Sequence, residues 1–269
     1  MRVGLIPPIS LLPEYGKGNL HLLLAHLFGD DRYRDHYRSE RRRGAHLIVD
    51  NSAHEKGEGI DSANLLDAAH DVLAQEIVVP DVLFNTWSTI QRAKEAHGTW
   101  LRGKRKLRRQ FSKLDPTLMY VPQGNFPEQW AECLWGLCQL HSDSVWDHSI
   151  RKGFSIGVSK DYEAWEGGLP FLFGKHLVPA RRRYGFNVHL LGWGRNLADL
   201  TYLRRKYPWV RSIDSAKPFV YGLNEMEIHL NKVAEYPGRP INYFFMDKFT
   251  EEMKRCMQYN IAVLQRAAQ

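Results

Sequence analysis

Residues 45–54 read AHLIVDNSAH, an apolar and partly β-branched run that stops at Asp50 in a group of polar side chains. A short apolar run bounded by turn-forming residues is typical of a buried strand. Seven further runs share this character, which makes eight predicted strands with His46–Asp50. They are Arg2–Pro7, Glu76–Asp81, Leu118–Gln123, Phe154–Val158, Asn187–Leu191, Val210–Asp214 and Ile241–Phe245.

Longer amphipathic stretches separate these runs and predict helices. They are Ser62–Leu73, Thr86–His97, Pro127–His141, Asn196–Tyr207, Leu223–Ala234 and Asp247–Arg266. Strands that alternate with helices predict an α/β protein with a parallel sheet. Eight such units in 269 residues predict a single (β/α)8 TIM barrel domain over residues 1–269, without an internal repeat or linker.

The charge balance favours a polyanionic partner, because 37 Lys and Arg face 30 Asp and Glu. Basic residues gather in Arg32–Arg43, Arg102–Lys113 and Arg181–Arg183. We expect the first cluster to form an extended loop on the active-site side of the barrel, although a basic run is as often a solvated face. The candidate contacts to a nucleic-acid backbone are Arg41, Arg42, Arg43, Arg105, Lys106, Arg181 and Arg182.

Cys133, Cys138 and Cys256 have no zinc-type spacing, and their odd number argues against a disulfide framework. We therefore expect buried, reduced thiols and neither a metal nor a cofactor. The sequence has no signal-peptide pattern and no apolar run of membrane-spanning length, so a soluble cytoplasmic protein is expected. Its oligomeric state is left open.

Polar side chains end one predicted strand after another. Asp50 and Asn51 follow the second strand, Asp81 the third, Gln123 the fourth and Asp214 the seventh. In a β/α barrel these carboxyl ends form the open face that carries the chemistry. The alternative for each Asp is a helix cap or turn residue. Several of them together favour a shared site.

These motifs resemble the guanine transglycosylases that install queuine-type 7-deazapurines. The likeness runs in matching order from His46 to Lys217. It is strongest to the minimal, often phage-encoded DNA-guanine transglycosylases, whose motifs after strands two and seven are similar to DNSA at 50–53 and IDS at 213–215. The archaeal tRNA enzymes share a related DSA, here residues 214–216.

The resemblance implies that Asp214 is the nucleophile and Asp50 the general acid and base. Chemistry supports both roles, because breaking an N-glycosidic bond leaves an electron-deficient sugar carbon and requires a proton at the departing base. Asp81 is expected to accept from N1–H and the amine of guanine, and Gln123 to serve the O6 and N7 edge. The other implied base contacts are Asn51, the N–H groups of Gly157 and Val158, the Leu191 carbonyl, and a ring sandwich between His54 and Leu191.

One difference from this family bears on whether the substrate is DNA or RNA. The tRNA enzymes carry a Cys-x-Cys-x-x-Cys zinc site and the archaeal ones an RNA-binding domain, and this sequence shows neither. The resemblance therefore implies exchange of guanine in DNA for a preQ0-type 7-deazaguanine, in a host cytoplasm if a phage encodes the chain. A tRNA substrate and a non-catalytic partner subunit are the alternatives.

Some aromatic and histidine residues have two interpretations. Trp165 and Trp193 are candidates for stacking on an extracted base, with core packing as the alternative. His189 lines the pocket or packs beside it, and Gly192–Gly194 forms a pocket wall or a phosphate loop. The histidines in helical patterns, which we expect to be structural, are His21, His26, His70 and His141.

Overall fold

The computed structural model describes residues 1–107, 116–146, 153–193, 197–229 and 237–269, and within these the side chains except those of 101–107 and 145–146. Eight parallel strands form one sheet in the order β1-β8-β7-β6-β5-β4-β3-β2. Their bounds are β1 (Arg2–Leu5), β2 (Leu20–Leu24), β3 (His46–Asp50), β4 (Glu76–Val78), β5 (Thr117–Tyr120), β6 (Phe154–Ser159), β7 (Asn187–Leu191) and β8 (Val210–Ser215).

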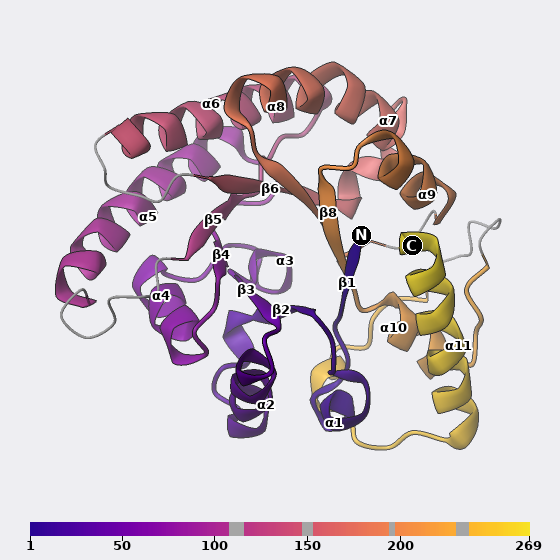
Figure 1. The fold of residues 1–269 in the computed structure, drawn as a ribbon. Coiled ribbons are helices and arrows are strands. Elements are labelled where there is room, and N and C mark those ends of the chain that lie inside the picture. The colour runs from indigo at the N-terminus through magenta and orange to yellow at the C-terminus, as the bar shows by residue number, and fades with distance from the viewer. Residues whose placement is uncertain (108–115, 147–152, 194–196, 230–236) are drawn as a thin grey trace.

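The sheet curls into a nearly closed barrel with helices outside it (Figure 1). β1 pairs with β8 along its length, from Arg2 opposite Ser212 to Leu5 opposite Ser215. β1 and β2 are the two ends of the hydrogen-bonded order, and they meet side by side: a Cβ built on Gly4 would lie 3.6 Å from the Leu20 carbonyl oxygen. The predicted (β/α)8 TIM barrel class is confirmed.

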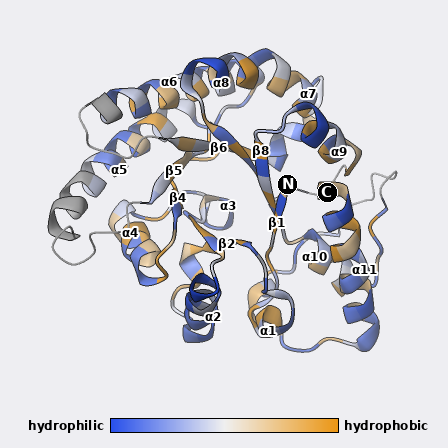
Figure 2. Ribbon diagram, in the orientation of Figure 1, coloured by the Kyte–Doolittle hydropathy of each residue, from blue (hydrophilic) through white to orange (hydrophobic). Residues whose placement is uncertain are grey.

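Helices connect successive strands, and their ribbons in Figure 2 mix hydrophobic and hydrophilic residues; in Leu197–Lys206, for example, the buried residues are Leu197, Leu200 and Leu203. Side-chain caps begin several of them: Asp61 accepts from the N–H groups of Ala63 and Asn64, and Thr250 accepts from Met253. The helices are α1 (Leu12–Tyr15), α2 (Asp31–Arg42), α3 (Ala53–Lys56), α4 (Ser62–Asp71), α5 (Thr86–Leu107), α6 (Pro127–Trp146), α7 (Gly168–Leu172), α8 (Val178–Tyr184), α9 (Leu197–Lys206), α10 (Lys217–Leu223) and α11 (Glu251–Ala268).

Two sequence predictions are wrong at the ends of the chain. Leu20–Leu24 forms β2, although its leucine-rich sequence suggested a helix, so His21 lies in a strand and His26 in the short 3-10 helix Ala25–Leu27. Ile241–Phe245 is not a strand: Ile241 is fully exposed and Tyr243–Phe245 is a 3-10 helix. The barrel still has eight strands, because the unpredicted strand Leu20–Leu24 takes the place of the predicted strand Ile241–Phe245.

The helix predicted at Leu223–Ala234 is also wrong, because α10 ends at Leu223 and residues 224–229 are not helical; residues 230–236 lie outside the described part. The chain then returns across the barrel in a segment that we call the C-terminal strap (residues 237–246). The Tyr243 hydroxyl donates to the Ile6 carbonyl, and the Phe244 ring meets the His26 ring edge-on at 5.8 Å. The strap thereby spans the place where β1 and β2 meet.

An ion network fills the barrel at the amino ends of the strands. Glu76, at the start of β4, is fully buried and pairs with Arg211 of β8 and with His46 Nε2 of β3 at 3.3 Å. Burial alone would raise the pKa of Glu76, but hydrogen bonds from His46 and Arg211, with the charge of Arg211, lower it to about 2. The carboxylate therefore stays ionised inside the barrel.

All three cysteines are buried and unpaired, as expected. Trp193 is completely buried, so it is a core residue and the stacking interpretation is wrong for it. Across the part of the chain that the structure describes, no helix combines the length and the apolar character needed to span a membrane.

Candidate active site

A cavity of about 350 Å³ opens at the carboxyl ends of the strands. This volume lies within the range of roughly 300–1,000 Å³ that is usual for small-molecule sites. Its floor is apolar, and its walls carry the polar residues predicted from the strand ends. The predicted residues that line it are Asp50, Asn51, His54, Asp81, Gln123, Leu191 and Asp214.

Asp214 stands in β8 with its carboxyl group held from two sides. Oδ1 lies 2.9 Å from His189 Nε2, and Oδ2 accepts the backbone N–H of Gly192 at 3.1 Å. The other ring nitrogen of His189 lies 2.8 Å from Ser212 Oγ, which places the ring proton on Nε2 when the serine donates. Each carboxylate oxygen keeps a further lone pair, so the group is oriented and still able to react.

His189 is fully buried and does not line the cavity, so its contact with the site runs through Asp214. Of the two interpretations for His189, the packing position is therefore the observed one. Asp214 itself is 2% exposed, yet its side chain reaches the cavity wall. A buried carboxylate with fixed hydrogen bonds is suited to nucleophilic attack rather than to capping a helix.

Asp50 ends β3 and faces the same cavity. Its Oδ1 accepts the backbone N–H of Ser52 at 2.7 Å, within a turn in which Ser52 adopts a left-handed φ of 61°. Burial, followed by the negative charges of Glu55, Asp81 and Asp214, raises the pKa of Asp50 well above its usual value, although the Ser52 N–H opposes this. Asp50 is thus both a turn residue and a carboxyl group whose pKa lies above its usual range.

Asp81 forms the base of a buried polar triad with Asn51 and Gln123. Asn51 Nδ2 donates to Asp81 Oδ1 at 2.7 Å, and Gln123 Nε2 donates to Asp81 Oδ2. Burial raises the pKa of Asp81 to about 6, while these two hydrogen bonds act in the opposite direction. The carboxylate keeps lone pairs on the cavity side, so it can accept from a ligand.

Gln123 has little freedom to rotate. Its Oε1 accepts from the backbone N–H of Phe84 at 3.0 Å and from the Tyr162 hydroxyl at 2.7 Å. With one Nε2 proton committed to Asp81, a single amide proton is left for a ligand. Gln123 is therefore a fixed donor, and such a donor matches an acceptor on a purine edge.

The remaining predicted base contacts divide into two groups. His54 is exposed in α3 at the cavity mouth, and Leu191 ends β7 on the wall. Gly157 and Val158 are buried in β6, and the cavity is lined instead by the next two residues, Ser159 and Lys160. A Cβ at Gly157 would lie 2.8 Å from a Leu191 methyl group, so this glycine serves the packing of β6 against β7.

Four charged residues of the cavity wall escaped the sequence analysis: Glu55, Lys160, Lys217 and Arg239. Glu55 follows His54 directly and had a signal, namely a second carboxylate beside Asp50. Arg239 had none, because only the path of the C-terminal strap brings it to Glu55, at 3.0 Å. Both members of this ion pair line the cavity, so its wall carries both signs of charge.

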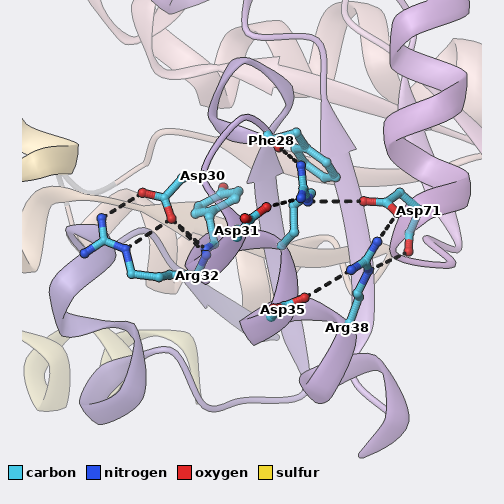
Figure 3. Close-up of polar contacts among 9 residues, drawn as sticks. Phe28, Asp30, Asp31, Arg32, Asp35, Arg38 and Asp71 are labelled. Atoms are coloured by element: carbon cyan, nitrogen blue, oxygen red, sulfur yellow. Dashed lines mark hydrogen bonds and ion pairs between the residues drawn. The ribbon is translucent and has the colours of Figure 1, made fainter.

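The first basic cluster is a helix, so the prediction of an extended loop is wrong. Residues Asp31–Arg42 form α2, which is hydrophilic over most of its length (Figure 2). Three of its arginines are paired with acidic neighbours (Figure 3): Arg32 with Asp30 at 2.7 Å, Arg34 with Asp31 and Asp71, and Arg38 with Asp35 and Asp71. These pairs cancel much of the positive charge that suggested phosphate binding.

The basic candidates lie away from the cavity. Arg41, Arg42 and Arg43 end α2 just before β3 begins, at the amino ends of the strands, and Arg41 Nε donates to the Leu73 carbonyl before β4. Arg181 and Arg182 lie in the last turn of α8 before β7, and Arg181 covers the Trp209 ring at 5.2 Å. The side chains of Arg105 and Lys106 lie outside the described residues.

Of two other predicted features, one lies outside the cavity wall and the other belongs to it. Trp165 is half-buried and packs on Tyr162, with ring centroids 4.4 Å apart. Gly192 lines the cavity with a φ of 65° and donates to Asp214, which fits a pocket wall; Gly194 lies outside the described residues.

Nowhere among the described side chains do three or more His, Cys, Asp or Glu residues come together in a way that could hold a metal ion. The polar groups of the cavity are carboxylates, amides and amines, which suit hydrogen bonding to a heterocycle and proton transfer. No protein-family model matches the chain, and a search of curated proteins likewise finds no match.

Proposed function

We propose that this protein is a DNA-guanine transglycosylase, which exchanges guanine in DNA for a 7-deazaguanine of the preQ0 type. One observation carries the proposal: two carboxyl groups suited to different roles, Asp214 and Asp50, line the same cavity as a fixed purine-reading pair, Asp81 and Gln123. The motif likeness after β3 and β8 supports the same activity and favours DNA as the polymer.

Base recognition rests on the buried triad. The Asp81 carboxylate accepts from N1–H and the exocyclic amine of guanine, which are adjacent donors on one edge of the base. The free proton of Gln123 Nε2 serves an acceptor on the neighbouring edge. A 7-deazaguanine presents the same N1–H and amine, so one set of contacts receives both the outgoing and the incoming base.

The first chemical step breaks the bond between N9 of guanine and C1′ of the deoxyribose. An Asp214 oxygen forms a bond to C1′, and the electron pair of the C1′–N9 bond leaves with the base. Asp50 gives its proton to the imidazole ring of the departing guanine. The products are free guanine and a covalent ester between Asp214 and the sugar, with Asp50 ionised.

The second step reverses these transfers with the new base. Asp50 removes the N9 proton of the 7-deazaguanine, N9 bonds to C1′, and the Asp214 carboxylate leaves with the electron pair of the ester bond. Asp50 is protonated again, and the sugar keeps its original configuration after two displacements. The raised pKa of Asp50 suits this cycle, because the resting enzyme needs a protonated carboxyl there.

The test uses a DNA oligonucleotide whose guanine carries a tritium label, incubated with 7-cyano-7-deazaguanine. The wild-type protein releases labelled guanine, and Asp214→Ala does not. Asp67→Ala, at an exposed carboxylate of α4, is the matched control and keeps full activity. Full release by a correctly folded Asp214→Ala variant would rule out the proposed nucleophile.

The two alternatives are tested in the same assay. Labelled tRNA replaces the oligonucleotide to measure an RNA activity, and exchange on tRNA alone would move the substrate to RNA. A denaturing gel of the wild-type protein with DNA, in the absence of an incoming base, seeks the covalent Asp214 ester formed by this chain on its own. An ester formed without any other protein excludes a non-catalytic partner subunit.

A further inference from the structure

Three aromatic side chains stand exposed shortly after β4 and β5: Phe84 in the loop after β4, Trp87 in the first turn of α5, and Phe126 in the loop after β5. Phe84 is 44% exposed, Trp87 69% and Phe126 47%. β4 and β5 are paired neighbours, with Ile77 opposite Leu118, so the two loops start side by side at the open face of the barrel. We call these three side chains the aromatic rim.

The aromatic rim is built onto the base-reading part of the cavity. Leu83, next to Phe84, lines the cavity, and the Phe84 N–H donates to Gln123 Oε1 at 3.0 Å. The Thr86 hydroxyl donates to the Gln123 carbonyl at 2.7 Å, which fixes the first turn of α5 that carries Trp87. The contacts that orient Gln123 therefore also hold the rim in place.

The backbone of Phe84 is strained, with a φ of 59°. A bulky residue in this left-handed region is an outlier, and glycine or asparagine takes it readily. Two hydrogen bonds impose it, from Phe84 N–H to Gln123 and from Asn85 N–H to the Val82 carbonyl at 3.1 Å. The ring recovers little burial in return, so packing does not account for an aromatic residue at this turn. Strain of this kind concentrates at functional sites.

We propose that the aromatic rim stacks on the nucleobases that flank the exchanged guanine, and that the strand bound there is unpaired. The inference rests on the proposed function. A guanine held by Asp81 and Gln123 has left its base stack. Its neighbours are joined to it covalently and leave the cavity beside Leu83, where the exposed rings of Phe84 and Trp87 offer flat apolar faces. Aromatic side chains bind unpaired bases in this way with little sequence preference.

The binding test uses a fluorescein-labelled single-stranded DNA oligonucleotide with one central guanine, and the same strand in a duplex. Fluorescence anisotropy gives the Kd for wild type, Trp87→Ala and Phe84→Gly. We expect each variant to bind the single strand about tenfold more weakly, the loss that removing one stacked base typically causes. Wild type binds the single strand more tightly than the duplex. The control Tyr259→Ala removes a 43% exposed ring from α11 and keeps the wild-type Kd.

Folding and binding are separable at Phe84. Because glycine tolerates a φ of 59°, Phe84→Gly keeps or raises the melting temperature while it removes the ring. A drop in affinity with an unchanged melting temperature supports the stacking role. Wild-type affinity in both rim variants, or equal wild-type affinity for duplex and single strand, overturns it.

The guanine-release assay on the same samples separates this inference from the proposed function. If wild type exchanges guanine and the rim variants bind DNA normally, the proposed exchange activity is supported and the stacking role of the aromatic rim is rejected. Rim-dependent binding without any exchange supports the rim and rejects the transglycosylase. A wild-type protein that neither binds nor exchanges rejects both.

Discussion

Binding of a guanine-like base is expected to depend on pH through Asp81. Burial raises the pKa of this carboxyl group to about 6, and only its ionised form accepts from both N1–H and the amine of the base. At pH 5 about a tenth of the groups are ionised, so affinity falls about tenfold between pH 8 and pH 5. Isothermal titration calorimetry with 7-cyano-7-deazaguanine measures this directly.

The stability of the free protein changes in the opposite direction. The pKa of Asp81 rises from 3.8 to about 6 on folding, so the folded state holds this proton more tightly than the unfolded state. The associated stability is fully present below pH 3.8 and is lost as pH rises through 6, a loss of about 3 kcal/mol. Acid thus strengthens the contribution of Asp81 to the fold while it weakens ligand binding.

Asp81→Asn isolates this effect from the other titrating groups. The variant cannot ionise, so the difference in unfolding free energy between it and wild type shifts in its favour by about 2.5 kcal/mol between pH 4 and pH 8. Guanidinium unfolding followed by circular dichroism gives both values, and Asp67→Asn is the exposed control. A difference that is constant with pH, or a base affinity unchanged at pH 5, would refute the assignment of the raised pKa to Asp81.

Three further predictions concern other parts of the molecule. Glu76→Gln removes a carboxylate whose pKa is held at about 2 against an ordinary 4.5, so we expect urea unfolding at pH 7 to show a loss of about 3 kcal/mol in the free energy of unfolding. The difference from wild type should close as pH falls from 4.5 towards 2, and a difference that does not change with pH contradicts the ion network. Leu73→Gly relieves a φ of 55° just after α4 and should raise the unfolding free energy by about 0.5–1 kcal/mol, whereas destabilisation speaks against strain there. Glu55→Gln removes a charge that raises the pKa of Asp50, so the alkaline limb of the guanine-exchange rate should move to lower pH; an unmoved limb means that Asp50 is not the acid.

The barrel can be predicted from the amino-acid sequence because the evidence for its strands is local. A run such as Leu47, Ile48 and Val49 is apolar at every position, which only a strand buried on both faces requires, and all three are fully buried. Leu20–Leu24 escaped because leucine suits helices and strands alike, and pairing with β3 decides the matter. Tertiary pairing of this kind leaves no trace in a single short run.

The residues of the candidate site divide in the same way, into those that the local sequence predicts and those that only the tertiary fold brings to the cavity. Asp50, Asp81, Gln123 and Asp214 were found because each ends a predicted strand, and the barrel brings strand ends together. Arg239 was missed because it belongs to no strand. The arginines of α2 were misjudged because their acidic partners, such as Asp71 on α4, come from another part of the chain.

The C-terminal strap shows that eight strands do not by themselves complete this fold. Every other neighbouring pair of strands in the barrel is joined by backbone hydrogen bonds. The strap bridges the remaining gap between β1 and β2, through the contacts of Tyr243 with Ile6 and of Phe244 with His26. A shortened protein ending at residue 223 would keep all eight strands, Asp50 and Asp214. It would lack the C-terminal strap and with it Arg239, which pairs with Glu55. A smaller engineered version must therefore retain the chain through residue 246.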